Sequence, residues 1–217
     1  MDFETARFNM IEQQIRPWDV LDPEVLSACS EIRRELFVPE DYRQLAFSDT
    51  SIGLGHGQSM MPPKVEARLL QALAIRAGDR ILEIGTGSGY LTALLATLGA
   101  HVTSIEQHED LSSKAQASLR SAGIGNVKLH VGDGVDGWST AEPYDVIVVT
   151  GSCPGRRPAI EQQLSINGRM FAVIGSAPVM EATLITRLSK DNWAAESLFE
   201  TDLTPLTGAE LEPEFEF

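Results

Sequence analysis

The sequence predicts an α/β protein with a doubly wound, mostly parallel sheet of seven strands and an N-terminal helical cap. Three observations support this fold class. Apolar strand-like segments alternate with helical patterns after residue 63, the first such segment ends in closely spaced glycines, and short helical patterns precede it. Alternating strands and helices are typical of a parallel sheet covered on both faces. The 217 residues suffice for one such domain with modest additions.

Two helical segments predict the N-terminal cap. Phe8, Ile11 and Ile15 recur at helical spacing in "FNMIEQQI". The second helix is expected to start with Asp22 as N-cap and Pro23 at the first helical position, because an aspartate side chain accepts from free backbone amides there and proline needs no amide hydrogen bond. We therefore expect short helices packed on the main domain.

The chain divides where the pattern changes. We expect residues 1–63 to form the cap and a lid loop, and residues 64–217 to form the main domain, both within one compact unit. Strands are expected at 80–85, 101–106, 127–134, 144–151 and 169–175. Helices are expected at 64–75, 90–100, 109–123 and 158–168. Segments 181–190 and 192–203 are expected to close the sheet as an edge hairpin with one antiparallel strand.

Composition limits the partners. The net charge of −14 disfavours binding to nucleic acid and to anionic membranes, because both carry negative charge. No apolar run approaches the length that spans a bilayer, and the acidic start lacks a signal-peptide core. The two cysteines, Cys29 and Cys153, make no disulfide framework. We expect a cytoplasmic protein with no nucleic-acid or membrane partner, and the sequence leaves its oligomeric state open.

A glycine-rich turn follows the first predicted strand. Gly85, Gly87 and Gly89 are spaced G-x-G-x-G, and glycine lets the backbone turn sharply and approach a ligand closely. The dinucleotide fingerprint has a third glycine where Tyr90 stands here, which disfavours a nicotinamide oxidoreductase. Glu83 precedes the first glycine by two residues, where a carboxylate can bind an ammonium group directly or through water. Taken alone, the glycines are also consistent with a tight strand-helix turn.

Acidic residues end the next two predicted strands. Glu106 stands at the carboxyl edge of the sheet, where a carboxylate can accept both hydroxyls of a ribose. Asp133 can accept from an adenine amino group, with Gly134 keeping the backbone close. Each acid alone is also consistent with a solvated strand end or a turn. With Glu83, they predict a pocket for a nucleoside that carries an amino-acid tail, which describes S-adenosylmethionine and its product S-adenosylhomocysteine.

Longer segments carry a more specific pattern. They are "MIEQQI", "DPEVL" and "ELFVPE" in the cap, then "GHGQ", "RILEIGTGSGYLTALLA", "NVKLHVGDGVDGW", "YDVIVVTG" and "TPLTG". In these segments the chain resembles the protein-L-isoaspartate O-methyltransferases, within the class I methyltransferases. The resemblance implies a Rossmann-like sheet whose last two strands are exchanged in order. It also implies a repair enzyme that methylates the α-carboxylate of isoaspartyl residues, so that its partner is a damaged protein or peptide.

The resemblance also assigns a role to "GLGHGQSMMPPK", residues 53–64. In the family this segment reads close to G-H-G-Q-T-I-S-x-P and lies over the cofactor. Ser59 stands at the family's Thr position and Met61 at its Ser position, so we assign both to the acceptor site, where one hydroxyl has become a thioether. The residues assigned to the cofactor pocket on this basis are Gln58, Ser59, Gln107 and Thr207.

Two alternatives stay open beside an isoaspartyl methyltransferase. One is a methyltransferase with another acceptor, and the other is a non-catalytic module that binds the cofactor. A carboxylate acceptor is ionised at neutral pH and needs no general base, so the lack of a Ser-His-Asp set or a metal-ligand cluster fits the main interpretation. An alcohol or phenol would need a base, and His56 is the nearest candidate, although a loop histidine is more often structural.

Two features have no assigned role. Cys153 follows the fourth predicted strand and either lines the pocket or is a loop thiol. The acidic tail "AELEPEFEF", residues 209–217, is expected to fray or to pair with a sheet edge.

Overall fold

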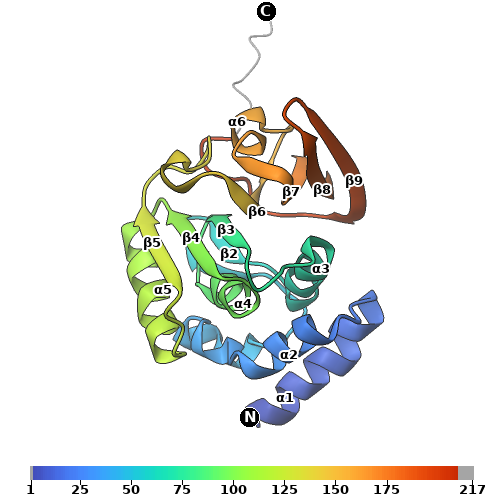
Figure 1. The fold of residues 1–217 in the computed structure, drawn as a ribbon. Coiled ribbons are helices and arrows are strands. Elements are labelled where there is room, and N and C mark those ends of the chain that lie inside the picture. The colour runs from blue at the N-terminus through green and yellow to red at the C-terminus, as the bar shows by residue number, and fades with distance from the viewer. Residues whose placement is uncertain (1, 210–217) are drawn as a thin grey trace, which may run out of the picture.

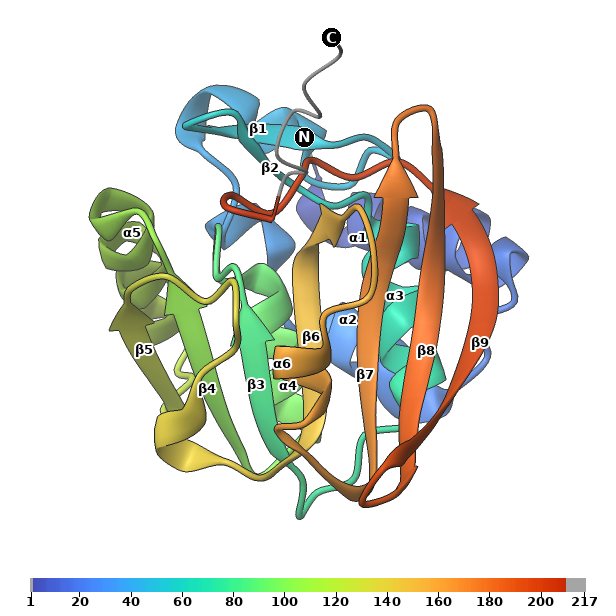
Figure 2. The same ribbon diagram turned by 90° about the horizontal axis from the view of Figure 1, so that it is seen from above.

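The computed structural model describes residues 2–209, so all but the first residue of the acidic tail lies outside the described part of the chain. The molecule has three layers, which Figure 1 shows edge-on. Most helices cover one face of a central sheet, and the short helix α6 lies on the other face (Figure 2). The N-terminal helices α1 and α2 form the outermost part of the helical layer (Figure 1).

The central sheet has the strand order β5-β4-β3-β6-β7-β8-β9. Its strands are β3 (Arg80–Ile84), β4 (His101–Glu106), β5 (Val127–Val131), β6 (Tyr144–Cys153), β7 (Leu164–Ser176), β8 (Val179–Ser189) and β9 (Asn192–Thr201). Strands β3 to β7 pair in parallel, β8 is antiparallel to β7, and β9 is antiparallel to β8. The predicted fold class is therefore confirmed, including the hairpin at one edge.

The helices are α1 (Phe3–Met10), α2 (Pro23–Glu31), α3 (Pro63–Leu73), α4 (Tyr90–Leu98), α5 (Glu109–Ser121) and α6 (Pro158–Glu161). Helix α2 starts as predicted, because Asp22 accepts from the amides of Glu24 and Val25. Ile11 and Ile15 are buried in a π-helical turn after α1, whereas Phe8 is 63% exposed and lies outside the predicted apolar face. No helix among the described residues is long and apolar enough to cross a membrane.

The helix predicted over 158–168 is wrong in its second half. Helix α6 ends at Glu161, and Leu164 already pairs with Tyr144 of β6. The pairing then slips, so that Arg169 is the next partner of β6, and Asn167 takes a left-handed backbone with φ 66° inside the irregularity. Strand pairing on β6 thus overrides the helical spacing of this segment.

The cap and the main domain share one hydrophobic core. Ile15 and Val25 of the cap belong to the same buried cluster as Leu69, Leu94 and Phe171. The division at residue 63 accordingly remains an interpretation of the sequence and is not marked by a separate core.

The lid segment folds as a small two-stranded hairpin, which we call the roof hairpin. Strand β1 (Ile52–Gly55) pairs antiparallel with β2 (Gln58–Met60). Its turn is formed by His56 and Gly57, whose φ angles are 54° and 73°. These strands were not predicted from the sequence. Figure 2 shows the hairpin above the carboxyl ends of the parallel strands, next to the chain that follows β9.

Candidate active site

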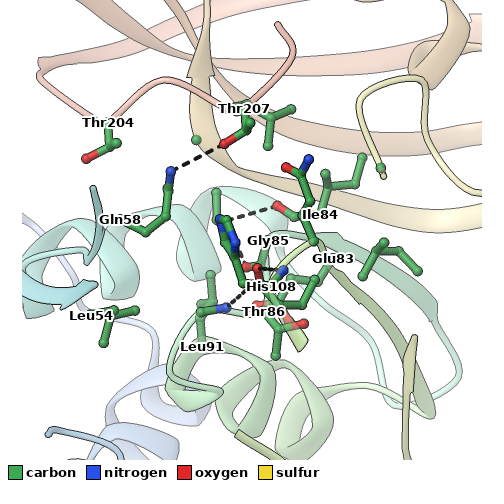
Figure 3. A pocket seen from close by; sticks show the side chains of 18 of the residues that line it. Leu54, Gln58, Glu83, Ile84, Gly85, Thr86, Leu91, His108, Thr204 and Thr207 are labelled. Carbon is green, nitrogen blue, oxygen red and sulfur yellow. Dashed lines mark hydrogen bonds between the residues drawn. The ribbon is translucent and has the colours of Figure 1, made fainter. Parts of the chain in front are cut away.

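A cavity opens under the roof hairpin at the carboxyl ends of β3, β4, β5 and β6, and we call it the strand-end cavity (Figure 3). Its lining residues are Leu54, Gln58–Met61, Glu66, Glu83–Ser88, Leu91, Ile105–His108, Gly132–Val135, Thr150, Gly151, Leu203, Thr204, Leu206 and Thr207. Every residue that the sequence analysis assigned to a site lines this cavity, with the single exception of Gly89.

The turn after β3 is held against the neighbouring strand. Gly85 has φ 96°, and a Cβ atom there would collide with Thr150 Oγ1. The Thr150 hydroxyl lies 2.9 Å from the carbonyl oxygen of Ile84 and 2.8 Å from that of Gly85. The Gly85 amide donates to the carbonyl of Ile105 in β4. These bonds leave the glycine backbone facing the cavity.

The other two glycines of the turn have different roles. Gly87 lines the cavity, and a Cβ there would come within 3.2 Å of Leu54 in the roof hairpin. Gly89 does not line the cavity: it is the N-cap of α4 with φ 84°, and a Cβ there would lie 3.1 Å from Ala115 of α5. Gly89 therefore permits the close packing of α4 on α5, and our assignment of it to ligand contact is not supported by its position.

Glu83 is a fully buried carboxylate at the end of β3. Its Oε2 accepts from the hydroxyls of Thr92 at 2.5 Å and Ser104 at 2.6 Å, and its Oε1 has no partner. Burial raises the pKa of Glu83 to about 8, although the two hydroxyls oppose this shift. The site thus contains one buried acceptor oxygen that needs a donor.

Glu106 is held at the end of β4 by backbone amides. Its Oε2 accepts from Gly87 at 2.8 Å and its Oε1 from His108 at 3.0 Å. The side chain is 5% exposed and lines the cavity. A carboxylate oxygen has two lone-pair sites, so each oxygen can still accept a hydroxyl.

The loop after β5 supplies the third acid. Asp133 is exposed, and its Oδ1 accepts from the amide of Val135 at 2.9 Å in a local turn. Gly134 lies close to the sheet, since a Cβ there would be 3.0 Å from Ile84. The loop therefore approaches the end of β3 closely enough to line the same cavity as Glu83 and Glu106.

The roof of the cavity is formed by the roof hairpin and the segment 203–207. Gln58 Nε2 donates to Thr207 Oγ1 at 3.4 Å, as Figure 3 shows, and the hydroxyls of Ser59 and Thr204 lie 3.3 Å apart. The segment itself is bonded firmly to β6, because Ser152 exchanges backbone hydrogen bonds with Thr204 and Leu206. Gln107 and Thr207 both line the cavity as predicted.

Met61 forms part of the cavity wall beside a buried ion pair that the sequence analysis missed. Its side chain is 5% exposed, and its carbonyl accepts from Arg34 Nη2 at 2.8 Å. Arg34 Nη1 donates to Glu66 Oε2, and Arg34 Nε donates to the carbonyl of Ala46. Burial raises the pKa of Glu66 to about 7, although the Arg34 guanidinium opposes this shift. A glutamate spaced with Leu69, Leu70 and Leu73 on the apolar side of α3 was the signal that could have revealed it.

His56 lies at the turn of the roof hairpin and outside the cavity lining. Its ring stacks on that of His108 with centroids 4.0 Å apart, and its Nε2 lies 2.9 Å from Asp110 Oδ1. This position fastens the hairpin to the start of α5 and favours the structural interpretation over a general base. Cys153 is buried at the end of β6 and also lies outside the cavity lining.

Comparison with known proteins decides the family. Residues 6–211 match the family described as Protein-L-isoaspartate(D-aspartate) O-methyltransferase (PCMT). The chain belongs to this family. It is 40% identical over 209 residues to protein-L-isoaspartate O-methyltransferase 1 of Rhodopseudomonas palustris (strain HaA2), covering 96% of this chain and 85% of that protein. It is 38% identical to the protein-L-isoaspartate O-methyltransferase of Petrotoga mobilis, covering 96% and 98%.

Solved structures show the same fold. A crystal structure of a Plasmodium falciparum protein assigned to the family, in complex with S-adenosyl-L-homocysteine, superposes with a TM-score of 0.81 at 19% identity, covering 95% of this chain and 99% of that one. A second structure, of a protein-L-isoaspartate O-methyltransferase, gives a TM-score of 0.81 at 25% identity and covers 95% of this chain and 66% of that one. The resemblance seen in the sequence is confirmed, and the protein is an S-adenosylmethionine-dependent methyltransferase of this family.

The residues that line the strand-end cavity have the chemistry that this cofactor requires. The unpartnered Glu83 Oε1 offers an acceptor for an ammonium group, and Glu106 offers two oxygens at the next strand end. At Gly85 and Gly134 a side chain would collide with the surrounding walls or crowd against them, so these glycines keep the backbone at the cavity surface. A glycine turn that leads into a helix and a row of strand-end acids are what a nucleoside with an amino-acid tail requires.

Proposed function

We propose that this protein transfers the methyl group of S-adenosylmethionine to the free α-carboxylate of isoaspartyl residues in damaged proteins or peptides, in the cytoplasm. The strand-end cavity, roofed by a hairpin of the family's "GHGQ" segment, carries the proposal, together with similarity over nearly the whole chain. In this site Glu83 receives the amino end of the cofactor, Glu106 the ribose and Asp133 the adenine. Gln58, Gln107 and Thr207 complete the cofactor pocket.

The acceptor is proposed to reach the site through an adjoining cavity of about 460 Å³. Ser59 lines both cavities, and its hydroxyl lies beside that of Thr204, which also lines both. Ser51 and Ser152 line the adjoining cavity and add hydroxyl groups. Hydroxyl donors along this route suit an acceptor that carries a carboxylate.

Methyl transfer to a carboxylate requires the protein mainly to position the two reactants. When bound, the cofactor would supply an electrophilic methyl group on a sulfonium sulfur, to be taken up by the acceptor carboxylate with a neutral thioether as the leaving group. The acceptor carboxylate is already ionised at neutral pH, so no side chain needs to remove a proton. The roof hairpin excludes water and aligns the two reactants, and such alignment is a large part of the rate enhancement in transfer reactions.

Met61 favours a second candidate, a methyltransferase of the same family with another acceptor. Its thioether lines the strand-end cavity where a hydroxyl would otherwise stand, and a thioether is only a weak acceptor of hydrogen bonds and donates none. The adjoining cavity is lined by Ser59 and not by Met61, which supports the carboxylate acceptor as the first choice.

A methyl-transfer assay tests the proposal. We expect the protein to transfer a labelled methyl group from S-adenosylmethionine to a peptide that contains one isoaspartyl residue. The matched control is the same peptide with a normal aspartyl residue, which should accept none. Cofactor binding by calorimetry without transfer to the isoaspartyl peptide would point to another acceptor or to a non-catalytic binder.

A further inference from the structure

Three glutamates from three different elements line the strand-end cavity: Glu66 on α3, Glu83 on β3 and Glu106 on β4. The first is unexplained by the proposed cofactor contacts. Glu66 is only 3% exposed, and its Oε2 is bonded to Arg34, which is itself fully buried. Glu66 also lines the cavity that holds Glu83, with Arg34 bonded to one of its two oxygens.

Glu83 carries the decisive observation. Its Oε2 has two hydroxyl donors, whereas its Oε1 is buried and has no partner, and the residue lines the cavity. An ionised oxygen without a donor is costly in such surroundings, so this oxygen holds a proton or accepts a hydrogen bond from a ligand or a water molecule. The geometry therefore allows two states of one oxygen.

The charges around Glu83 favour the protonated state when no ligand is bound. The titratable and charged groups that face this region are Glu106 of β4, Glu66 of α3, Arg34 and Cys29 of the cap, Tyr90 of α4, and His108 and Asp133 across the cavity. Burial, together with the negative charges of Glu106 and Glu66, raises the pKa of Glu83 to about 8 against the opposing effect of the two hydroxyls. Burial also keeps Cys29 and Tyr90 uncharged by raising the pKa of each.

We propose that Glu83 and Glu66 form one proton-exchanging site for the amino end of the cofactor, in which Glu83 Oε1 holds a proton in the free protein and exchanges it for an N–H of the α-ammonium group on binding. The O–H bond of the Glu83 carboxyl breaks, its proton passes to a solvent or buffer acceptor, and no other covalent bond changes. Glu66, held in place by Arg34, is a positioning residue that sets the proton affinity of Glu83 through its charge. This inference rests on the proposed function.

The exchange has a defined sign. Binding requires the ionised form of Glu83, so affinity for a ligand with an ammonium group rises with pH until Glu83 is ionised in the free protein. With a pKa of about 8, affinity should rise about tenfold from pH 6 to 7 and about fivefold from pH 7 to 8. About one proton should be released per ligand bound at pH 7, falling to roughly a quarter of a proton at pH 8.5.

Calorimetry with two ligands tests the proposal. The first probe is S-adenosylhomocysteine, which has the amino-acid tail. The second is 5′-methylthioadenosine, which keeps the nucleoside and the thioether but lacks the tail. Titrations in buffers of different ionisation enthalpy give the number of protons released. We expect the release and the rise of affinity with pH for S-adenosylhomocysteine only, because both ligands share every other group near His108 and Asp133.

Two variants separate the roles of the glutamates. Glu83→Gln should bind S-adenosylhomocysteine without proton release and with an affinity that no longer changes with pH. Glu66→Gln keeps an oxygen for Arg34 and should move the rise in affinity to lower pH by removing one negative charge. Binding of 5′-methylthioadenosine shows that each variant is folded, and Glu24→Gln on the exposed side of α2 serves as the matched control that behaves like the unaltered protein.

The outcomes are distinct. Binding of S-adenosylhomocysteine without proton release would overturn this inference and leave the proposed function standing. An equal release with 5′-methylthioadenosine would overturn it as well, because the proton would then come from the nucleoside side. A Glu66→Gln variant with an unchanged pH profile would overturn the proposed role of Glu66 and leave Glu83 acting alone. Binding of neither ligand would overturn the proposed function and the inference together.

Discussion

At the floor of the strand-end cavity, the hydrogen bonds of Glu83 and Glu106 are 2.5–3.0 Å long, whereas the bonds from Gln58 and Ser59 in the roof hairpin measure 3.4 and 3.3 Å. The floor bonds of Glu83 are buried and those of Glu106 are partly buried, whereas the roof bonds lie at exposed or partly buried positions. Short buried bonds fix a ligand site in advance, and long exposed ones are cheap to break. The difference indicates a rigid binding floor beneath a cover that can open for the cofactor.

Arg34 joins the two regions, and its removal should produce the largest effect. Arg34→Ala leaves Glu66 without its partner in the core and frees the carbonyl of Met61. Breaking a buried ion pair on one side typically costs about 3–5 kcal/mol, so we expect a loss of that order in the free energy of unfolding, measured with urea. Arg33→Ala is the matched control, because that side chain is 60% exposed, and it should cost less than about 1 kcal/mol. Equal losses of unfolding free energy in both variants would show that the buried contacts of Arg34 stabilise the protein no more than the exposed contact of Arg33 does.

The floor is tested by Glu106→Ala. The change removes the acceptor of two backbone amides and of the proposed ribose hydroxyls. Each hydrogen bond to a charged group is worth roughly 1.5–3 kcal/mol, so affinity for S-adenosylhomocysteine should fall about tenfold to more than a hundredfold by calorimetry. Glu109→Ala, an exposed neighbour at the start of α5, should leave the affinity unchanged. An unchanged affinity in Glu106→Ala would move the ribose to another part of the cavity.

Met61→Ser tests the wall between the two regions. We expect isoaspartyl methylation by the unaltered protein to be measurable but weak, and kcat/KM to rise by up to about tenfold in the variant, because a hydroxyl adds a donor. The shorter side chain also leaves a void, which offsets part of the gain. Affinity for S-adenosylhomocysteine, measured in parallel, separates the two contributions. A fall in kcat/KM with cofactor affinity intact would mean that the thioether shapes the acceptor site.

The smallest effect is expected at the tip of the roof. His56→Ala removes the stack on the partly buried His108 and the exposed contact with Asp110. Contacts of this kind contribute little, so we expect dissociation of S-adenosylhomocysteine to accelerate by no more than about fivefold in stopped-flow measurements. His101→Ala, at the opposite end of β4, should change nothing. A loss of methyl transfer far beyond the change in dissociation would revive His56 as a catalytic base.

The floor was predictable because its signals are local. Glu83, Glu106 and Asp133 each stand at the end of a strand that the apolar pattern reveals, and parallel strands bring their carboxyl ends to one edge. Gly89 belongs to the same pattern, but a glycine is needed there because Ala115 of α5 lies too close for a side chain. The spacing of the glycines does not reveal this contact. Local pattern therefore predicts which residues meet more reliably than what each one does.

The roof hairpin and the ion pair of Arg34 and Glu66 could not be predicted from local sequence patterns. The pair of Arg34 and Glu66 joins residues 32 positions apart, and only a charge on the apolar side of α3 marks it. The strands of the roof hairpin are short, and β1 has glycine at two of its four positions, a residue with little strand preference. The predicted end of α6 was wrong for a related reason, because pairing with β6 decides the structure of Leu164.

One guanidinium contacts the chain at three separate places: the carbonyl of Ala46, the carbonyl of Met61 and the carboxylate of Glu66. The base of the roof hairpin is thereby pinned to the cap and to α3, while its tip is held by exposed contacts. The firmly held end of the hairpin is therefore the one beside Met61, and the less firmly held end is the turn at His56 and Gly57. Substitutions at the turn of the roof hairpin should alter how often the hairpin opens. Substitutions of Arg34 or Glu66 should decide whether the hairpin is held over the cavity at all.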